Sequence, residues 1–518
     1  MSGRGEVRLE SGITALRQTE YLLNSESLPA RTTLPQFGQL FLLTIGALCV
    51  HGFHPYVEDA EIYVPGIKQA VDPNLYPANQ AFFASHASLT LFPNLVAASI
   101  RITHLSSDWA LFLWHVVSIF LFLWACWRIG RLAFRDSRAA WGGAALVASL
   151  LTMPVAGTAL YIMDQYLTTR ALSTAATLWV IVGVVERQWL RAALWLLFTG
   201  LIHPLMVVFC LAYVVLWLLD ERLWPEKESM QSPAPVAAMI FPLNLFPPVS
   251  DAYREVLRTR SYFFLSRWEW YEWLGIFGPL GLLEWFRRIA RRHDLPVLER
   301  LCRTTIVFGA VFFIAALLIS VPTRMAPLAK LQPLRALQLE FILLFIFAGG
   351  LLAKFVLKQA AWRWLLLFVP ISAGMYFAQR QLFPATSHIE WPGATSGNPW
   401  VQAFLWVRGH TPANAFFALD PNYMRAPGED DHGFRALAER SRMADRVKDS
   451  GAVSMFPLLA DPWRAQVRAL AGWAGFKRED FERLHDQFGV DWVIVQKGAN
   501  PGLDCPYQNS AVMVCQVP

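Results

Sequence analysis

Charged residues are scarce in this sequence. Only 16% of its 518 residues are Asp, Glu, Lys or Arg and 55% are hydrophobic, whereas a soluble globular protein carries about 25% charged residues. The chain also has no Walker phosphate loop, no GxGxxG turn, no CxxC pair and no GxSxG elbow. Nucleotide chemistry and serine hydrolysis therefore lack support, and neither an internal repeat nor a low-complexity tract is present.

Long apolar runs take the place of these features, and the chain is rich in aromatic residues, with 22 Trp and 36 Phe. A helix needs about 20 consecutive apolar residues to cross a bilayer, and several windows approach that length. We therefore predict a multi-pass membrane protein built as an all-α bundle. Weaker, Pro-interrupted apolar stretches lie at 88–103 and 235–248. The candidate spans are 36–53, 109–127, 139–157, 167–185, 190–201, 205–219, 270–286, 304–321, 334–355 and 362–377.

Basic residues gather in four short loops between these spans, at 128–138, 187–191, 287–293 and 354–363. Loops of this kind tend to stay in the cytoplasm. The net charge of +6 is therefore interpreted as a topology signal, and we expect no nucleic-acid partner. No cleavable signal peptide is apparent, so the first apolar run should act as an uncleaved signal anchor.

This orientation divides the chain into three parts. We predict a cytoplasmic N-terminal tail at 1–35, a transmembrane domain at 36–384 with a large first external loop at 51–108, and an extracytoplasmic domain at 385–518. The last part mixes charges with short apolar runs, which indicates a small α/β domain. Its expected elements are helices at 398–409, 461–470 and 478–488 and strands at 415–419 and 492–496.

The number of spans depends on one region. Between Arg191 and Trp268 the chain must cross the membrane an odd number of times. If 190–219 bends near His203 and so supplies two crossings, then 235–248 must supply a third, and the chain has about eleven spans. If 190–219 is one kinked helix, the total is nine; we prefer eleven.

Two cysteines stand apart from the other four. Cys505 and Cys515 lie ten positions apart near the polar C-terminus, whereas the others lie in or beside candidate spans. A disulfide persists only in an oxidising compartment, which an extracytoplasmic domain provides. We predict that this pair is bonded, with Cα atoms less than about 7 Å apart.

A group of acids, Glu58, Asp59 and Glu61, follows the first span. Ionised carboxylates at a membrane boundary are costly unless they are paired, bound to a metal or used in function. A carboxylate can act as a base toward an acceptor hydroxyl, and it can hold a divalent cation such as Mg²⁺ or Mn²⁺ that neutralises a phosphate leaving group. The alternative is a solvated loop.

Asp164 and Arg170 lie at the external end of the fourth span, on the same side as this acidic group. Asp164 is a second candidate catalytic or metal-binding carboxylate, although it could also simply cap the following helix. His203 precedes a proline inside an apolar segment. It is a candidate binding residue, and the alternative is a core histidine.

Two further external stretches carry candidate binding residues. Trp268, Glu269 and Tyr271 could form a platform for a sugar or a lipid head group, or they could belong to an interfacial aromatic belt. Arg324 and Arg335 bracket a short external loop. A guanidinium clamps a phosphate well, but an arginine at a bilayer interface can also snorkel to the water.

In combination these motifs resemble the GT-C superfamily of polytopic glycosyltransferases, in particular its uncharacterised bacterial branch. The resemblance implies a base or metal-ligand role for Asp59, with Glu58 second, and it places Asp164 in the acidic site. No acceptor motif like the WWD-type tail of oligosaccharyltransferases is found, so the acceptor stays open. The matching stretches are Glu58-Asp59 with 62–70, DPNLYPANQAFF, TRALS at 169–173, Ile202-His203-Pro204, QPLR at 332–335, HTPANAFF and GFRALAERS.

The resemblance implies a multi-pass enzyme of a bacterial cytoplasmic (inner) membrane with a periplasmic C-terminal domain. It would move a sugar from a polyprenyl-phosphate donor in the membrane lipid to an extracytoplasmic acceptor. One alternative is a transporter or flippase of lipid-linked saccharides. Such proteins commonly carry internal repeats and midplane sites, whereas here the acids gather at one mouth. Another alternative is a non-catalytic membrane protein whose external domain binds a partner.

Overall fold

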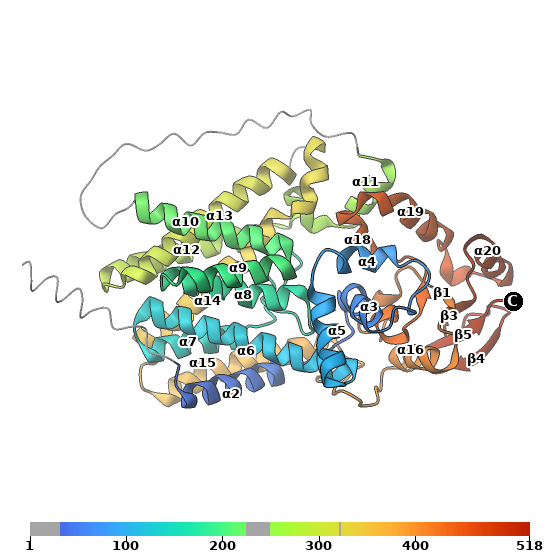
Figure 1. Cartoon of the computed structure of the whole chain (residues 1–518), viewed down its shortest axis with the longest axis horizontal. Coiled ribbons are helices and arrows are strands. Elements are labelled where there is room, and N and C mark those ends of the chain that lie inside the picture. The colour runs from blue at the N-terminus through green and yellow to red at the C-terminus, as the bar shows by residue number, and fades with distance from the viewer. Residues whose placement is uncertain (1–31, 224–248, 321–322) are drawn as a thin grey trace, which may run out of the picture. The chain divides into compact units, whose positions relative to one another are not determined.

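The structure is a computed structural model, and it describes residues 32–223, 249–320 and 323–518 (Figure 1). The side chains of Arg222, Leu223, Thr323, Arg324 and Ala326 also lie outside the described part. Residues Leu43–Pro518 form one compact unit, and Met1–Leu42 group separately. The account below concerns the larger unit, apart from the bounds of α2.

Six of the described helices are long and apolar enough to cross a membrane, which supports the prediction of a multi-span membrane protein. A seventh span is formed if α4 (Ala81–Ala87) and α5 (Phe92–Thr103), which meet at an angle of 85°, count as one broken helix. The six are α2 (Leu34–His51), α6 (Ser107–Phe134), α10 (Pro204–Leu223), α13 (Pro296–Ser320), the stretch Pro327–Leu357 that contains α14 (Leu337–Leu351), and α15 (Ala361–Leu382).

The structure does not confirm eleven spans. Three of the predicted spans form helices of 13 to 17 residues, and at a rise of about 1.5 Å per residue these are shorter than a bilayer core of about 30 Å. The α12 helix (Trp270–Arg292) is long but includes charged residues and Pro279. The stretch 235–248 lies outside the described residues. The short helices are α7 (Ser137–Ser149), α8 (Thr169–Val185) and α9 (Trp189–Ile202).

The chain breaks between α9 and α10 for a local reason. Proline has no backbone N–H, and it disfavours a helical conformation in the residue before it. His203, which precedes Pro204, accordingly has an extended backbone with φ −153° and ψ 95°. The segment therefore forms two helices and not one kinked helix. The two helices pack on each other, and the side chain of Val207 in α10 lies against Gly200 in α9.

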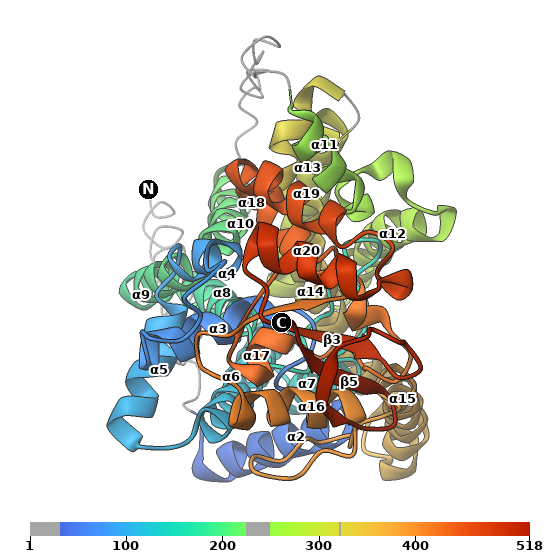
Figure 2. The ribbon, with the colours of Figure 1, turned by 90° about the vertical axis from the view of Figure 1, so that its right-hand side faces the viewer.

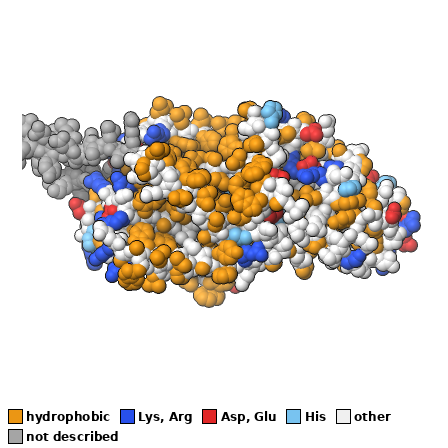
Figure 3. All heavy atoms as spheres, turned by 90° about the horizontal axis from the view of Figure 1, so that it is seen from below, with side chains coloured by type: hydrophobic (Ala, Val, Ile, Leu, Met, Phe, Trp, Pro, Cys, Tyr) orange, Lys and Arg blue, Asp and Glu red, His pale blue; other side chains and the backbone are white. Residues whose placement is uncertain are grey.

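Ion pairs join the basic ends of the helices. Arg128 of α6 pairs with Glu186 after α8. Four further contacts connect the remaining loops: Arg187 with Glu221 at 2.7 Å, Arg303 with Asp220 at 2.7 Å, Arg287 with Glu299 at 3.4 Å, and the rings of His293 and Phe355 at 4.4 Å. The four basic loops thus lie at one end of the bundle. Figure 3 shows Lys and Arg side chains gathered at that end and hydrophobic side chains over the middle of the face.

Glycines let the central helices approach closely. A Cβ added to Gly142 of α7 would lie 2.5 Å from the carbonyl oxygen of Gly349 in α14, and one added to Gly349 would lie 2.3 Å from the oxygen of Gly142. The two backbones are therefore in direct contact. Small residues at a helix interface are the usual way in which membrane helices pack closely.

The C-terminal part contains a five-stranded sheet with the order β2-β1-β3-β5-β4. The central strands β1 (Phe416–Leu419) and β3 (Trp492–Gln496) are parallel, and they confirm the two predicted strands. The predicted helices are present as α16 (Pro399–His410), α19 (Ala460–Ala469) and α20 (Arg478–Phe488). Sequence patterns missed three strands: β2 (Ser441–Arg442), which pairs with β1, and β4 (Asp504–Gln508) and β5 (Val512–Gln516), which form an antiparallel hairpin.

The predicted disulfide is confirmed. Cys505 of β4 is bonded to Cys515 of β5, and their Cα atoms lie 3.9 Å apart. The bond connects the two strands of the hairpin that ends the chain.

The loop 51–108 and the C-terminal part share one hydrophobic core. Val57 and Ile67 belong to the same buried cluster as Phe404, Phe417 and Phe434. The α3 helix (Ala60–Val71) packs on α17 (Phe434–Ala438), and the two lie side by side in Figure 2. Residues 385–518 therefore share one buried cluster with the loop 51–108, and a second buried cluster, which includes Met443, Trp473 and Val493, lies within the C-terminal part itself.

Candidate functional site

A cavity of about 170 Å³ lies at the end of the bundle opposite the basic loops. It is located where α8 begins, where α9 meets α10 and where the chain enters α14. Four cations and one carboxylate line it: Arg170, Arg260, Arg335 and Lys448 around Asp59. The cavity therefore combines segments from the loop 51–108, the membrane helices and the C-terminal part.

Asp59 is held between two cations. Its Oδ2 atom accepts hydrogen bonds from both terminal nitrogens of Arg170 at 3.3 Å, and its Oδ1 accepts one from Nζ of Lys448 at 3.3 Å. Burial alone would raise the pKa of Asp59, but the charges of Lys448, Arg170 and Arg335 outweigh burial and hold this pKa well below its usual range. Asp59 is thus ionised at neutral pH.

Asp164 lies behind Arg170 and does not line the cavity. Its Oδ2 atom accepts a hydrogen bond from Arg170 at 2.9 Å and another from the hydroxyl of Thr168 at 3.1 Å. The helix-cap interpretation of Asp164 is wrong, because α8 begins at Thr169 and Thr168 is the residue that caps it. Asp164 instead orients the guanidinium that reaches Asp59.

Lys448 is a site residue that sequence patterns did not reveal. It precedes α18 (Asp449–Met455), and its Nζ atom pairs with Glu58 and with Asp59. Burial alone would lower the pKa of Lys448, but the negative charges of Glu58 and Asp59 raise it above its usual value. No motif surrounds this lysine, and nearly 390 positions separate it from its partners.

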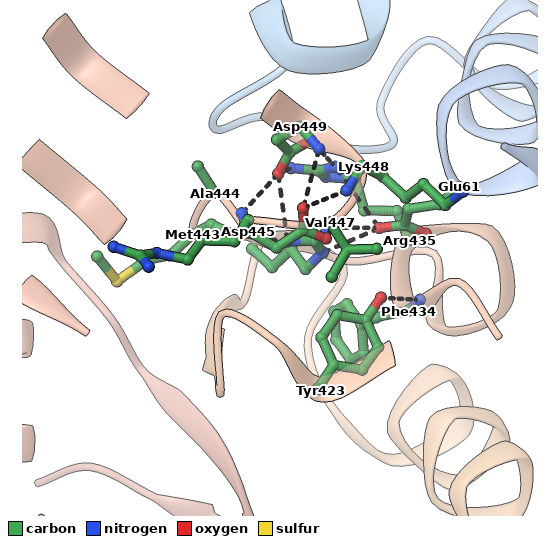
Figure 4. A network of polar contacts seen from close by, with 12 residues as sticks. Glu61, Tyr423, Phe434, Arg435, Met443, Ala444, Asp445, Val447, Lys448 and Asp449 are labelled. Carbon is green, nitrogen blue, oxygen red and sulfur yellow. Dashed lines mark hydrogen bonds and ion pairs between the residues drawn. The ribbon is translucent and has the colours of Figure 1, made fainter. Parts of the chain in front are cut away.

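Glu61 belongs to a buried ion network and does not line the cavity. Its Oε1 atom lies 2.8 Å from Nη2 of Arg442 and 3.5 Å from Nη1 of Arg435. Arg435 also pairs with Asp449 at 2.8 Å (Figure 4). Arg442 pairs with Asp445 at 2.5 Å. This network fixes the segment that carries Lys448.

Arg335 lies in the same cavity as Asp59. It lies in the turn η4 (Pro333–Ala336) and lines the same cavity. Its Nε atom is buried and has no hydrogen-bond partner among the described residues. The predicted partner Arg324 has its side chain outside the described part of the chain. Arg260, which sequence patterns did not single out, donates to the carbonyl oxygen of Val447 at 2.7 Å.

His203 also lines the cavity, beside Pro204 and Leu205. Its position at the break between α9 and α10 places it there, so it is a wall residue of the site. Hydrophobic side chains complete the lining: Ile62, Leu89, Leu205 and Met455.

The aromatic stretch before α12 is not brought to the cavity. Trp268 is buried and donates from its indole nitrogen to the carbonyl oxygen of Tyr262 at 3.3 Å. Glu269 forms a capping box with Glu272 at the start of α12. Tyr271 is exposed. These positions fit a helix start and an interfacial belt better than a binding platform.

The residues around Asp59 do not fit a divalent cation. Hard cations prefer several oxygen ligands, yet Asp59 and Asp164 are both already bound by Arg170, and the charges that face Asp59 are positive. Within the described ranges, no three His, Cys, Asp or Glu side chains come together as a metal-binding group. A role for Mg²⁺ or Mn²⁺ stays a prediction, and no step below depends on it.

The fold and the cavity together define a helical membrane protein with a cationic site at one end of its bundle. Comparison with models of known protein families finds none that matches the chain, and comparison with curated proteins finds no matching sequence. The arguments about function therefore rest on the geometry of the site.

Proposed function

We propose that this protein is a membrane glycosyltransferase of the GT-C type, which transfers a sugar from a polyprenyl-phosphate donor to an acceptor outside the cytoplasm. One observation carries the proposal: a single ionised carboxylate, Asp59, faces a cluster of four cations in a cavity that also has apolar walls. Transfer from a lipid phosphate requires each of these features at one place.

The cations suit the phosphate of the donor. Arg260, Arg335 and Lys448 line the cavity together with Arg170, so the charges of the lining sum to an excess of positive charge. Bonds between a cation and a phosphate oxygen are among the strong hydrogen bonds in proteins. Such an environment also stabilises the charge that appears on the phosphate as it leaves.

The apolar walls suit the lipid chain of the donor. Leu89 lines the cavity and is half-exposed, and Leu91 and Leu201 nearby are also exposed. These residues lie at the bend between α4 and α5 and at the end of α9. Backbone hydrogen bonding from Leu91 to Leu201 at 2.9 Å joins the two segments. A polyprenyl tail can leave the cavity along them into the bilayer.

In the proposed reaction the acceptor hydroxyl oxygen forms a bond to the anomeric carbon, and the bond from that carbon to the phosphate oxygen breaks. The proton of the hydroxyl passes to the carboxylate of Asp59, and polyprenyl phosphate leaves on the cationic side. Asp164 assists the reaction indirectly, because it orients Arg170. Glu58 also assists indirectly, because it pairs with Lys448.

The alternative of a flippase for lipid-linked saccharides receives less support. Transporter sites lie near the bilayer midplane between repeats. The cavity here is lined by helix ends and by external segments, and Lys448 comes from the C-terminal part. A site at one mouth of the bundle fits transfer between a lipid and an external acceptor better than passage across the membrane.

The test uses membranes that contain the full chain and polyprenyl-phosphate sugars with a radioactive label. The wild type should transfer the label to an acceptor. Asp59→Asn should lower turnover by about two orders of magnitude or more, the range for loss of a general base. The matched control is Asp72→Asn, which changes an exposed carboxylate on the same loop. Unchanged transfer by Asp59→Asn would remove Asp59 from the mechanism, and absence of transfer with every donor would contradict the proposal.

A further inference from the structure

Asp59 is not free to act as a base in the structure. Lys448 and Arg170 occupy its two oxygens, and the same cations hold its pKa low. An ion-paired carboxylate accepts a proton poorly, because protonation destroys both pairs. A base in this state needs an event that removes at least one of its cations.

We propose that Lys448 is this exchangeable cation: it leaves Asp59 for the phosphate of the donor, so that donor binding itself activates Asp59. The inference rests on the proposed function for the identity of the ligand, a lipid phosphate monoester or diester. It assigns to Lys448 two successive partners, a carboxylate in the resting protein and a phosphate in the complex.

Arg170 is less suited to such an exchange. Its guanidinium is clamped on the other side by Asp164, it is buried, and it stands in the first turn of α8. The planar fork of an arginine holds two carboxylates in fixed directions. Arg170 therefore stays with Asp59 and keeps the carboxylate oriented after the exchange.

Lys448 is also buried, but the chemistry of its side chain differs from that of Arg170. Its ammonium group is a compact charge on a flexible four-carbon stem with three rotatable donors. The ammonium group pairs with both Glu58 and Asp59. It can therefore leave Asp59 and still keep its ion pair with Glu58. Arg260 and Arg335 line the same cavity, and a phosphate drawn to them comes within reach of the ammonium.

Hydrogen bonds fix the main chain of Lys448, so an exchange of partners involves its side chain alone. Oδ1 of Asp445 accepts hydrogen bonds from the backbone nitrogen of Lys448 at 2.8 Å and from that of Asp449 at 2.9 Å. Arg442 binds Oδ2 of Asp445 at 2.5 Å and also reaches Glu61. Figure 4 shows these contacts gathered around the turn that carries Lys448. Asp445 is thus a positioning residue for the exchange.

The first experiment measures binding of dodecyl phosphate to the purified full chain in detergent, without any turnover. Lys448→Met should weaken binding about tenfold or more, because it removes one charge-assisted bond to phosphate. Lys497→Met, which changes an exposed lysine of the same C-terminal part, should leave binding unchanged. Unchanged binding by Lys448→Met would overturn the inference.

A double-mutant cycle then separates exchange from simple charge attraction. Asp59→Asn releases Lys448 from its resting partner, so it should tighten dodecyl phosphate binding in the wild-type background by more than it does in the Lys448→Met background. Equal effects of Asp59→Asn in the two backgrounds would mean that Lys448 does not leave Asp59, and they would overturn the inference.

Transfer assays distinguish failure of the inference from failure of the proposed function. Lys448→Met should raise the donor KM. Lys448→Arg should raise it as well and should also lower kcat, because its fork stays on the carboxylates and does not move to the phosphate. If the wild type binds dodecyl phosphate through Lys448 yet transfers no sugar, the proposed function fails and the exchange stands. If transfer occurs and Lys448→Met leaves the donor KM unchanged, the exchange fails and the proposed function stands.

Discussion

Glu61 and Arg442 lie 381 positions apart in the chain, yet Nη2 of Arg442 is 2.8 Å from Oε1 of Glu61, and both side chains are buried. The pair connects the loop 51–108 to the C-terminal part. It also fixes the segment before Lys448, which reaches into the cavity. The contacts that stabilise the fold therefore also hold a residue of the candidate site in place.

Arg442→Met should destabilise the protein strongly. It leaves Glu61, Asp445 and Asp449 without a buried cation that they share, and removal of one partner of a buried ion pair costs about 3–5 kcal/mol. Thermal unfolding in detergent measures the effect. Arg464→Met serves as the control. It breaks an exposed pair with Asp461, and it should not shift the melting temperature measurably. Equal melting temperatures for the two variants would show that the buried network does not hold the fold.

Asp164→Asn should reduce sugar transfer without direct contact to the substrate. The variant keeps the size of the side chain but loses the charge that orients Arg170, and misplacement of a reacting group by about 1 Å can lower the rate about 100-fold. We expect a lower kcat with a nearly constant donor KM. The control is Asp136→Asn, at the basic end of the bundle. A change in KM alone would place Asp164 in donor binding and not in orientation.

The carboxylate of Glu390 lies between two histidines, 2.8 Å from Nδ1 of His54 and 3.2 Å from Nε2 of His432. Burial would raise the pKa of Glu390, but the charge of His432 and two hydrogen bonds lower it from 4.5 to about 2. Burial would lower the pKa of His432, but Glu390 and other acceptors raise it above 6.5. The ion pair is thus favoured at mildly acidic pH.

Stability should accordingly pass through a maximum. The contribution of His432 is complete below pH 6.5 and is lost as the pH rises through its raised pKa, and the contribution of Glu390 is complete above pH 4.5 and is lost as the pH falls toward 2. Melting temperatures measured from about pH 4 to about pH 8 test this dependence. Glu390→Gln should flatten the curve over that range. A curve of unchanged shape would mean that other groups set the pH dependence.

Reduction of the disulfide between Cys505 and Cys515 should destabilise the terminal hairpin. A cross-link of this kind contributes about 2–4 kcal/mol by restricting the unfolded chain. Cys505→Ser with Cys515→Ser should match the reduced wild type in urea unfolding. Alkylation before and after reduction, read by mass spectrometry, should show that these two cysteines alone become reactive on reduction. Reactive thiols at both positions in protein from untreated membranes would contradict an oxidising location for this segment.

Local sequence decided those features whose causes are local. The apolar windows alone predict membrane-spanning helices, because burying backbone in lipid requires helices of a minimum length. The break at His203 follows from the geometry of the next proline. The strands Phe416–Leu419 and Trp492–Gln496 are short continuous apolar runs, so their burial can be read from composition.

The sequence also singles out Asp59 as a candidate, since an ionised acid beside a membrane boundary is costly unless it is paired, bound to a metal or functional. Its neighbours in sequence were less informative. Glu58 and Glu61 have the same charge and lie within three positions, yet one holds Lys448 and the other lies in a buried network. Which way each side chain points depends on α3 and on the C-terminal segments packed against it.

Tertiary structure alone decided the partners. Lys448 and Arg260 carry no recognisable motif, and they enter the site because a C-terminal turn folds over the loop 51–108. Asp164 faces Arg170 and not the cavity, and α8 starts two residues later than its apolar pattern indicates. The hairpin of Asp504–Gln508 and Val512–Gln516 is likewise invisible in sequence, since its outer strand is only partly buried. Charge pairs between distant segments leave no periodic pattern, and only the packing of those segments determines which charges meet.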